Sequence, residues 1–193
     1  EIVGRRRGDA TRLGYAMLML YMRWPGRALE AGEVPPAPVL AYVAQQLGEY
    51  LDLLHQSGLT QIAFELDDVW ISAASEILVT NFGIAQGVDL GGLLSANKIP
   101  ARTSCAPELI KGGKIDARTD FFSLGALLFE ALTGKKPAVN FESTDKTLAV
   151  EDFFPSRLRM GISSEWDTLV AKCLNPNPAK RIQSAVEFLH QVD

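Results

Sequence analysis

The chain has 193 residues, of which 47% are hydrophobic and 22% are charged; this composition argues against overall disorder and indicates one globular domain with a sizeable core. Its formal net charge of −4 gives no general attraction to nucleic acid or to an anionic membrane. Two cysteines, Cys105 and Cys173, and two histidines, His55 and His190, lack the spacing of metal ligands, which argues against a disulfide scaffold or a zinc site.

The longest apolar run is YAMLMLYM at 15–22, which is far shorter than the roughly 18 residues that suggest a membrane-spanning helix. The chain opens on the charged EIVGRRRGD and not on a basic end followed by an apolar stretch, so we expect no signal peptide. We therefore expect a cytoplasmic location without direct membrane contact, either for this chain alone or for a larger protein, including a membrane-anchored one, of which it is a part.

The first predicted elements are strands. The runs EIVGRRR and RLGYAMLMLYM flank a Gly-Asp turn, which predicts a β-hairpin. A connection rich in Pro and Gly, RWPGRALEAGEVPPAP, follows and ends near Pro38. We therefore divide the single domain 1–193 into a hairpin and hinge over about 1–35 and a helical lobe over about 36–193.

An amphipathic helix is predicted over 39–55, VLAYVAQQLGEYLDLLH. Its apolar residues recur at steps of three and four, at Leu40, Val43, Leu47, Leu51 and Leu54. Two short strands, Val69–Ser72 and Ile77–Thr80, are expected to form a small hairpin. The segment 84–105 is rich in Gly, Ser and Asn and is predicted to be a long surface loop.

The segment 116–134, DARTDFFSLGALLFEALTG, predicts a helix that is apolar on nearly all sides and therefore lies in the centre of the core. Gly134 is its stop signal. Two further helices are predicted: SSEWDTLVAKCL, with Ser163 or Ser164 as cap, and PAKRIQSAVEFLHQV, which opens on Pro178. The inward side chains expected in the last helix are Ile182, Val186 and Leu189.

Four segments with distinct patterns follow one another: NFGIA at 81–85, CAPELI at 105–110, the apolar segment 116–134, and KCLNPNPAKRIQSAVEFL at 172–189. They resemble, in order, the Asp-Phe-Gly motif, the Ala-Pro-Glu motif, the central buried helix and the closing Arg-containing motif of the protein kinase family. The texture is similar to that of bacterial serine/threonine kinases, from about Tyr15 onward. This resemblance implies an α+β, mostly α-helical fold: a kinase-like C-terminal lobe with a short N-terminal β-hairpin and with the N-terminal lobe largely absent.

The segment LLHQSGLTQIAFELDDVWIS at 53–72 aligns without a gap with the catalytic loop of the family. By this resemblance the His-Arg-Asp triplet becomes Gln61, Ile62 and Ala63, so a methyl group stands where the family has its proton acceptor. Loss of a general base costs roughly 10²–10⁴ in rate. The phosphate-stabilising Lys becomes Glu65, which places negative charge where negative charge develops in the reaction. The sequence therefore predicts no catalytic residue and no enzyme activity.

The resemblance also places changes at the metal ligands, with Asp68 at the Asn position and Asn81 at the Asp position. One carboxylate and one amide remain, which leaves residual Mg-ATP binding as the alternative. Trp70 matches a position under the adenine ring, and its indole is expected to block that site. No G-x-G-x-x-G motif occurs in the chain, and there is no room upstream for the strand that carries the phosphate-binding Lys. We expect no cofactor and no metal.

Structural residues of the family are retained. The resemblance implies that Asp120 accepts hydrogen bonds from the catalytic-loop backbone, and that Phe82 packs into the core beneath the loop. It also implies a buried salt bridge between Glu108 and Arg181.

We therefore expect a pseudokinase that acts as a protein-protein interaction, scaffolding or regulatory module, with an unidentified protein partner and without nucleic acid. Trp24, Phe153 and Phe154 are candidate contact residues, with core packing as the alternative for each. Two other functions stay open: a degenerate kinase that uses Asp68, Glu65 or Asp67 in new roles, and a nucleotide-sensing switch without catalysis.

Overall fold

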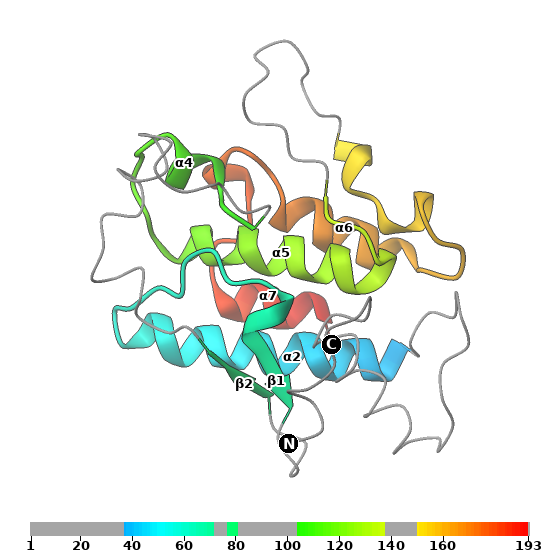
Figure 1. Cartoon of the computed structure of the whole chain (residues 1–193), viewed down its shortest axis with the longest axis horizontal. Helices are drawn as coiled ribbons and strands as arrows, with labels where there is room; N and C mark the ends of the chain where they lie inside the picture. Colours follow the sequence, from blue (N-terminus) through cyan, green and yellow to red (C-terminus); the bar gives the residue numbers. More distant parts are fainter. Residues whose placement is uncertain (1–36, 72–76, 81–103, 138–149, 193) are drawn as a thin grey trace.

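The computed structural model describes residues 37–71, 77–80, 104–137 and 150–192. Figure 1 shows α5 (Ala117–Thr133) in the middle of the helical body, with α7 (Ala185–Val192) and α2 (Ala37–Gln56) below it and α6 (Ser164–Cys173) above it in this view. Apart from these and shorter helical turns, the described residues contain a single two-stranded sheet. The predicted mostly α-helical fold is therefore confirmed.

Several predictions fall on other residues. The hairpin and hinge at 1–35 and nearly all of the predicted loop at 84–105 lie outside the described residues, as do Trp24, Asn81 and Phe82.

The first long helix is α2, and its predicted apolar stripe is buried. Leu40, Val43, Leu47, Leu51 and Leu54 are each at most 7% exposed, because steps of three and four residues return to one face of a helix. At Gly48 the helix approaches α7 so closely that an added Cβ would lie 2.8 Å from a side-chain carbon of Leu189. Glycine at this position therefore allows α2 and α7 to pack tightly.

The two predicted strands are confirmed. β1 (Val69–Ile71) follows the single turn η1 (Leu66–Asp68) and pairs with β2 (Ile77–Val79) in antiparallel register. Val69, opposite Val79, is fully buried, whereas Leu78, opposite Trp70, is 52% exposed. Alternate residues of a strand point to opposite faces, so one face of the sheet packs on the core and Trp70 and Leu78 share the other.

The central helix α5 is buried along almost its whole length, as its composition predicted. Asp116 caps it by accepting a hydrogen bond from the Arg118 backbone N–H, and Gly134 ends it in the left-handed conformation at φ 71°. At Gly125 an added Cβ would lie 2.5 Å from Cβ of Cys173. The absence of a side chain there lets α6 lie directly on α5.

The remaining helical turns are short. They are α4 (Pro107–Ile110), η2 (Val150–Phe153), η3 (Pro155–Arg157) and η4 (Pro178–Lys180). No helix in the described ranges is both long and apolar enough to span a membrane.

The prediction of one continuous helix from Pro178 was wrong. The segment forms η4, then an extended stretch with Arg181 at φ −87° and ψ 173°, and then α7 from Ala185. Ile182 is fully buried as predicted, but Val186 is 56% exposed, because the break changes which side of α7 faces the core. The Ser184 hydroxyl accepts a hydrogen bond from the Glu187 backbone N–H, as at the start of a capped helix.

Candidate functional site

The loop 61–68 lies between α2 and β1 and carries most of the predicted site positions. Asp120, in the first turn of α5, is fully buried and accepts hydrogen bonds from the backbone N–H groups of Gln61 (2.9 Å) and Ile62 (2.7 Å). Nε2 of His55 lies 2.8 Å from the same carboxylate. The contact that the resemblance implied for Asp120 is therefore present.

This anchoring coincides with unusual backbone geometry. Ile62 and Ala63 have φ angles of 58° and 54°, in the left-handed region that a β-branched residue rarely adopts. Such conformations cost about 1–3 kcal/mol each and persist where surrounding contacts fix them. The hydrogen bond from Ile62 to Asp120 provides such a constraint.

Gln61 forms a bridge between α2 and the end of β2. The Tyr50 hydroxyl donates to its Oε1 (2.6 Å), and its Nε2 donates to the Thr80 carbonyl oxygen (3.1 Å). Burial, together with the nearby charge of Asp120, raises the pKa of Tyr50 to about 12, so the hydroxyl stays a donor at neutral pH. Gln61, only 2% exposed, thus fixes Thr80, the residue before Asn81.

Ala63 is the residue that the resemblance aligns with the proton acceptor of the family. It is 7% exposed and packs in a small apolar cluster with Cys105 and Leu109. Its carbonyl oxygen accepts a hydrogen bond from the Ser104 hydroxyl (3.3 Å). A methyl group in these surroundings can neither accept a proton nor bind a metal.

Glu65 is the residue that the resemblance aligns with the phosphate-stabilising Lys of the family. Its Oε1 lies 3.7 Å from Nζ of Lys136, just beyond the end of α5, and the two side chains are 19% and 50% exposed. An ion pair this open to solvent contributes little to stability. Its consequence is local, because Lys136 brings a cation to this carboxylate from outside the loop 61–68.

Asp68 is 4% exposed, and its Oδ2 accepts a hydrogen bond from the Glu65 backbone N–H (3.0 Å). Its carbonyl oxygen accepts hydrogen bonds from the backbone N–H (2.7 Å) and hydroxyl (3.1 Å) of Thr80. The residue therefore closes the η1 turn and ties it to β2. No cluster of three or more His, Cys, Asp or Glu side chains suited to a metal occurs in the described ranges.

Glu108 and Arg181 form the buried salt bridge that the resemblance implied. Two guanidinium nitrogens of Arg181 lie 2.7 and 3.1 Å from the two Glu108 oxygens. The Arg181 guanidinium also donates to the carbonyl oxygens of Arg118 (2.6 Å) and Asn175 (3.0 Å) and lies over the Phe122 ring. Its side chain is fully buried, so this one residue joins α4, α5 and the segment before α7.

The candidate contact residues Phe153 and Phe154 differ in burial. Phe153 is 3% exposed and belongs to the main core, so core packing, the alternative reading, holds for it. Phe154 is half-buried, and the guanidinium of Arg157 lies 5.7 Å from the centre of its ring.

Sequence reasoning missed three residues of the site: Tyr50, His55 and Lys136. Tyr50 and His55 place polar groups next to the apolar stripe of this amphipathic helix, and buried polar groups usually have partners, so they carried a usable signal. Lys136 follows the stop of α5 and carried no signal toward Glu65.

Comparisons with known proteins add to this geometry. A family model described as "Domain of unknown function (DUF4158)" matches residues 1–56. The serine/threonine-protein kinase PknB of Mycobacterium leprae is 31% identical over 162 residues, which are 81% of this chain and 26% of the relative. PknJ of Mycobacterium tuberculosis is 30% identical over 178 residues, covering 84% of this chain and 29% of the relative. The chain thus spans only about a quarter of the length of these relatives.

Among solved structures, a double mutant of the Mycobacterium tuberculosis PknI kinase domain is similar in fold. The TM-score is 0.64 at 21% sequence identity, and the match covers 91% of this chain and 62% of that one. At this identity the match shows the fold alone.

Proposed function

Because the chain belongs to the serine/threonine protein kinase-like family, we propose that it is a pseudokinase module that transfers no phosphate and acts by binding a protein partner. The observation that carries this proposal is Ala63. The position that takes the substrate proton in the family bears a buried methyl group, packed against Cys105 and Leu109. Without a general base the rate falls by roughly 10²–10⁴.

The charge next to this position supports the same conclusion. Phosphoryl transfer needs cations where negative charge develops on the transferring group. Glu65 brings a carboxylate to that place, and Lys136 is close enough to neutralise part of it. A phosphate approaching this loop meets a paired anion where an active kinase presents a free ammonium group.

The hydrogen bonds of Asp68 also support the proposal. Magnesium is bound in proteins through one or two carboxylates together with substrate phosphates and water. The Asp68 side chain is 4% exposed, and its Oδ2 accepts a hydrogen bond from the Glu65 backbone N–H. This carboxylate therefore has a structural use in closing the η1 turn.

The buried polar side chains of the loop have hydrogen-bond partners within the chain. In the part of the chain that the structure describes, every buried side-chain nitrogen or oxygen has a hydrogen-bond partner. The Tyr50–Gln61–Thr80 bridge and the Asp120 anchors hold the loop in one shape with side chains of the chain itself. A loop whose buried polar side chains are satisfied in this way is suited to serve as a rigid binding module.

The test is thermal melting and phosphate transfer with the whole chain. Nucleotide that bound the folded state at a hundred times its Kd would add about 2.7 kcal/mol of stability. We expect no change in melting temperature with Mg-ATP and no label transferred from γ-labelled ATP to the chain or to a generic protein substrate. An active bacterial kinase run in parallel establishes that the assay detects transfer.

Asp68→Ala is the variant, because alanine removes both side-chain oxygens that could hold a metal. Transfer by the unchanged chain that disappears in Asp68→Ala would establish a degenerate kinase and end the pseudokinase proposal. A melting shift without transfer would replace it with the nucleotide-sensing alternative, in which Asp68 and Asn81 hold Mg-ATP.

The binding half of the proposal is tested by affinity capture with the whole chain. A partner that remains bound at physiological salt and is lost in Trp24→Ala would support a docking surface at Trp24. A partner that binds both chains equally would place the surface elsewhere.

A further inference from the structure

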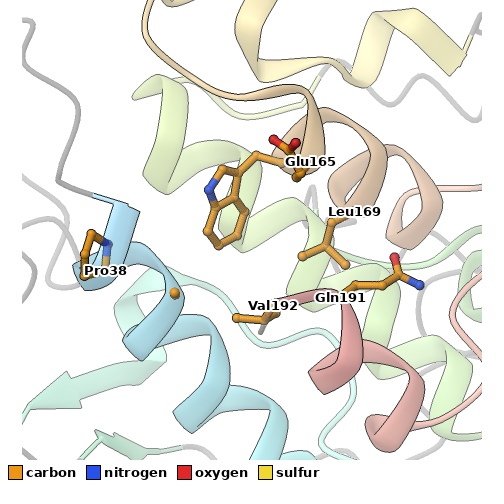
Figure 2. Close-up of a pocket in the computed structure, with 7 residues that line it drawn as sticks. Pro38, Glu165, Leu169, Gln191 and Val192 are labelled. Atoms are coloured by element: carbon orange, nitrogen blue, oxygen red, sulfur yellow. The ribbon is translucent and has the colours of Figure 1, made fainter.

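A pocket of about 350 Å3 opens where three helix ends meet: the beginning of α2, the beginning of α6 and the end of α7. Figure 2 shows Pro38 on one side, Leu169, Gln191 and Val192 on the other, and Glu165 at its edge. Cavities of roughly 300–1,000 Å3 with mostly apolar walls and a few polar groups are typical of small-molecule sites. The size and lining of this pocket match that class.

The walls and the edge of the pocket differ in chemistry. The lining includes the aliphatic residues Pro38, Ala41, Leu169 and Val192, the indole of Trp166 and the polar residues Glu165 and Gln191. A ligand that fills the pocket must therefore be mainly apolar, with a polar group at one end.

Glu165 sets the sign of that polar group. It is exposed, and hydrogen bonds from the Ser163 hydroxyl and from its own backbone N–H lower its pKa from the ordinary value of 4.5. The carboxylate is therefore ionised at neutral pH and repels carboxylates and phosphates. The neighbouring indole of Trp166 favours the same sign, because cations are attracted to the faces of aromatic rings.

We propose that this pocket binds a small amphipathic amine, with its apolar body against Leu169 and Val192 and its ammonium group between the Glu165 carboxylate and the Trp166 ring. The pocket lies at the beginning of α2, whereas the loop 61–68 follows the end of that helix. The proposal is therefore independent of whether the loop transfers phosphate.

The experiment titrates the whole chain with three probes of equal length: hexylamine, hexanol and hexanoate. The readout is the indole N–H resonance of Trp166 in a proton–nitrogen correlation spectrum, assigned by its loss in Trp166→Phe. We expect a saturable shift with hexylamine. Its affinity should exceed that of hexanol by about fivefold, which corresponds to one partly exposed ion pair, and hexanoate should bind most weakly.

Two variants separate charge from shape. Glu165→Gln keeps the acceptor oxygen but removes the charge, so it should lower the preference for hexylamine over hexanol and leave the affinity for hexanol unchanged. Ala41→Leu fills the pocket and should abolish the shift with both probes. Asp52→Asn is the control. It removes a charge from α2, the helix of Ala41, at a point about 16 Å along the helix from Ala41 at 1.5 Å per residue.

Three outcomes would overturn the proposal. The absence of a saturable shift with hexylamine and an unchanged hexylamine affinity in Ala41→Leu each remove the pocket as the site. Hexanoate binding as tightly as hexylamine removes the assignment of a cation.

Discussion

The loop 61–68 differs from the supporting layer beneath it, which consists of Asp120, Glu108 and Arg181. In the loop, the resemblance aligns Ala63 and Glu65 with the side chains that perform chemistry in the family. In the supporting layer, Asp120, Glu108 and Arg181 make the contacts that the resemblance implied, at distances between 2.6 and 3.1 Å. The comparison teaches that the contacts supporting this loop do not depend on the side chains at its aligned catalytic positions.

The largest loss of stability is expected for Arg181→Met, which removes the main contacts of the supporting layer. It leaves the Glu108 carboxylate buried without its cation and removes the donors to the Arg118 and Asn175 carbonyl groups. The free energy of unfolding, measured with urea, should fall by about 3–5 kcal/mol.

Glu108→Gln combined with Arg181→Met is the matched control. It removes the unpaired charge, so it should be less destabilised than Arg181→Met alone. A double variant that loses as much as the sum of the two single variants would show that the pair is not coupled.

A smaller effect is expected for Asp120→Asn. The new amide presents N–H groups where the carboxylate accepted bonds from Gln61, Ile62 and His55. Leaving a buried donor unsatisfied costs about 1–3 kcal/mol, and the amide protons of Gln61 and Ile62 should exchange faster with solvent. Unchanged exchange at both amides would show that Asp120 does not hold the loop.

The third prediction concerns the effect of pH on Asp116, which caps the helix that carries Asp120. The hydrogen bond from the Arg118 side chain, helped by its backbone N–H and opposed by partial burial, lowers the pKa of Asp116 from 3.8. A carboxyl group whose pKa is lower in the folded state adds stability above its unfolded pKa, and this stability is lost as pH falls through the folded value. Asp116→Asn, which keeps a good helix cap, should therefore lose less stability than the unchanged chain below about pH 4.

Urea unfolding of both proteins in steps through this acidic range checks the prediction. If the free energy of unfolding falls equally with pH in both proteins, Asp116 contributes nothing to the pH dependence of stability.

The smallest effect is expected in the loop itself. Glu65→Gln breaks only the partly exposed pair with Lys136, so the free energy of unfolding should change by less than about 1 kcal/mol. Lys136→Met is the matched partner variant, and a double-mutant cycle measures their coupling. A coupling as large as that of Glu108 and Arg181 would show that the altered loop position is itself part of the support.

Local sequence patterns predicted much of this fold. The apolar stripe of α2, the all-round apolar surface of α5 and the two short strands follow from periods of 3.6 and 2 residues. The start of α7 was also encoded, because Ser184 and Glu187 have the spacing of a capping box. The predicted continuous helix overrode this signal because the apolar residues before and after the break happen to fit one helical period.

Other features join residues that are distant in the chain. Glu65 meets Lys136, Gln61 meets Thr80, and Phe153 enters the core although Glu151 and Asp152 precede it. The local sequence around these residues contains no pattern that would predict either contact or the burial of Phe153.

By itself, the sequence determined the long helices α2 and α5, the family resemblance and the residues that align with the family's catalytic positions, because these depend on side-chain chemistry and on spacing along the chain. Only the tertiary structure decided which partners satisfy Gln61 and Glu65, and that three helix ends form a pocket beside Glu165. The physical reason is that burial and hydrogen bonding depend on distances in space, which packing sets only after the local elements have formed.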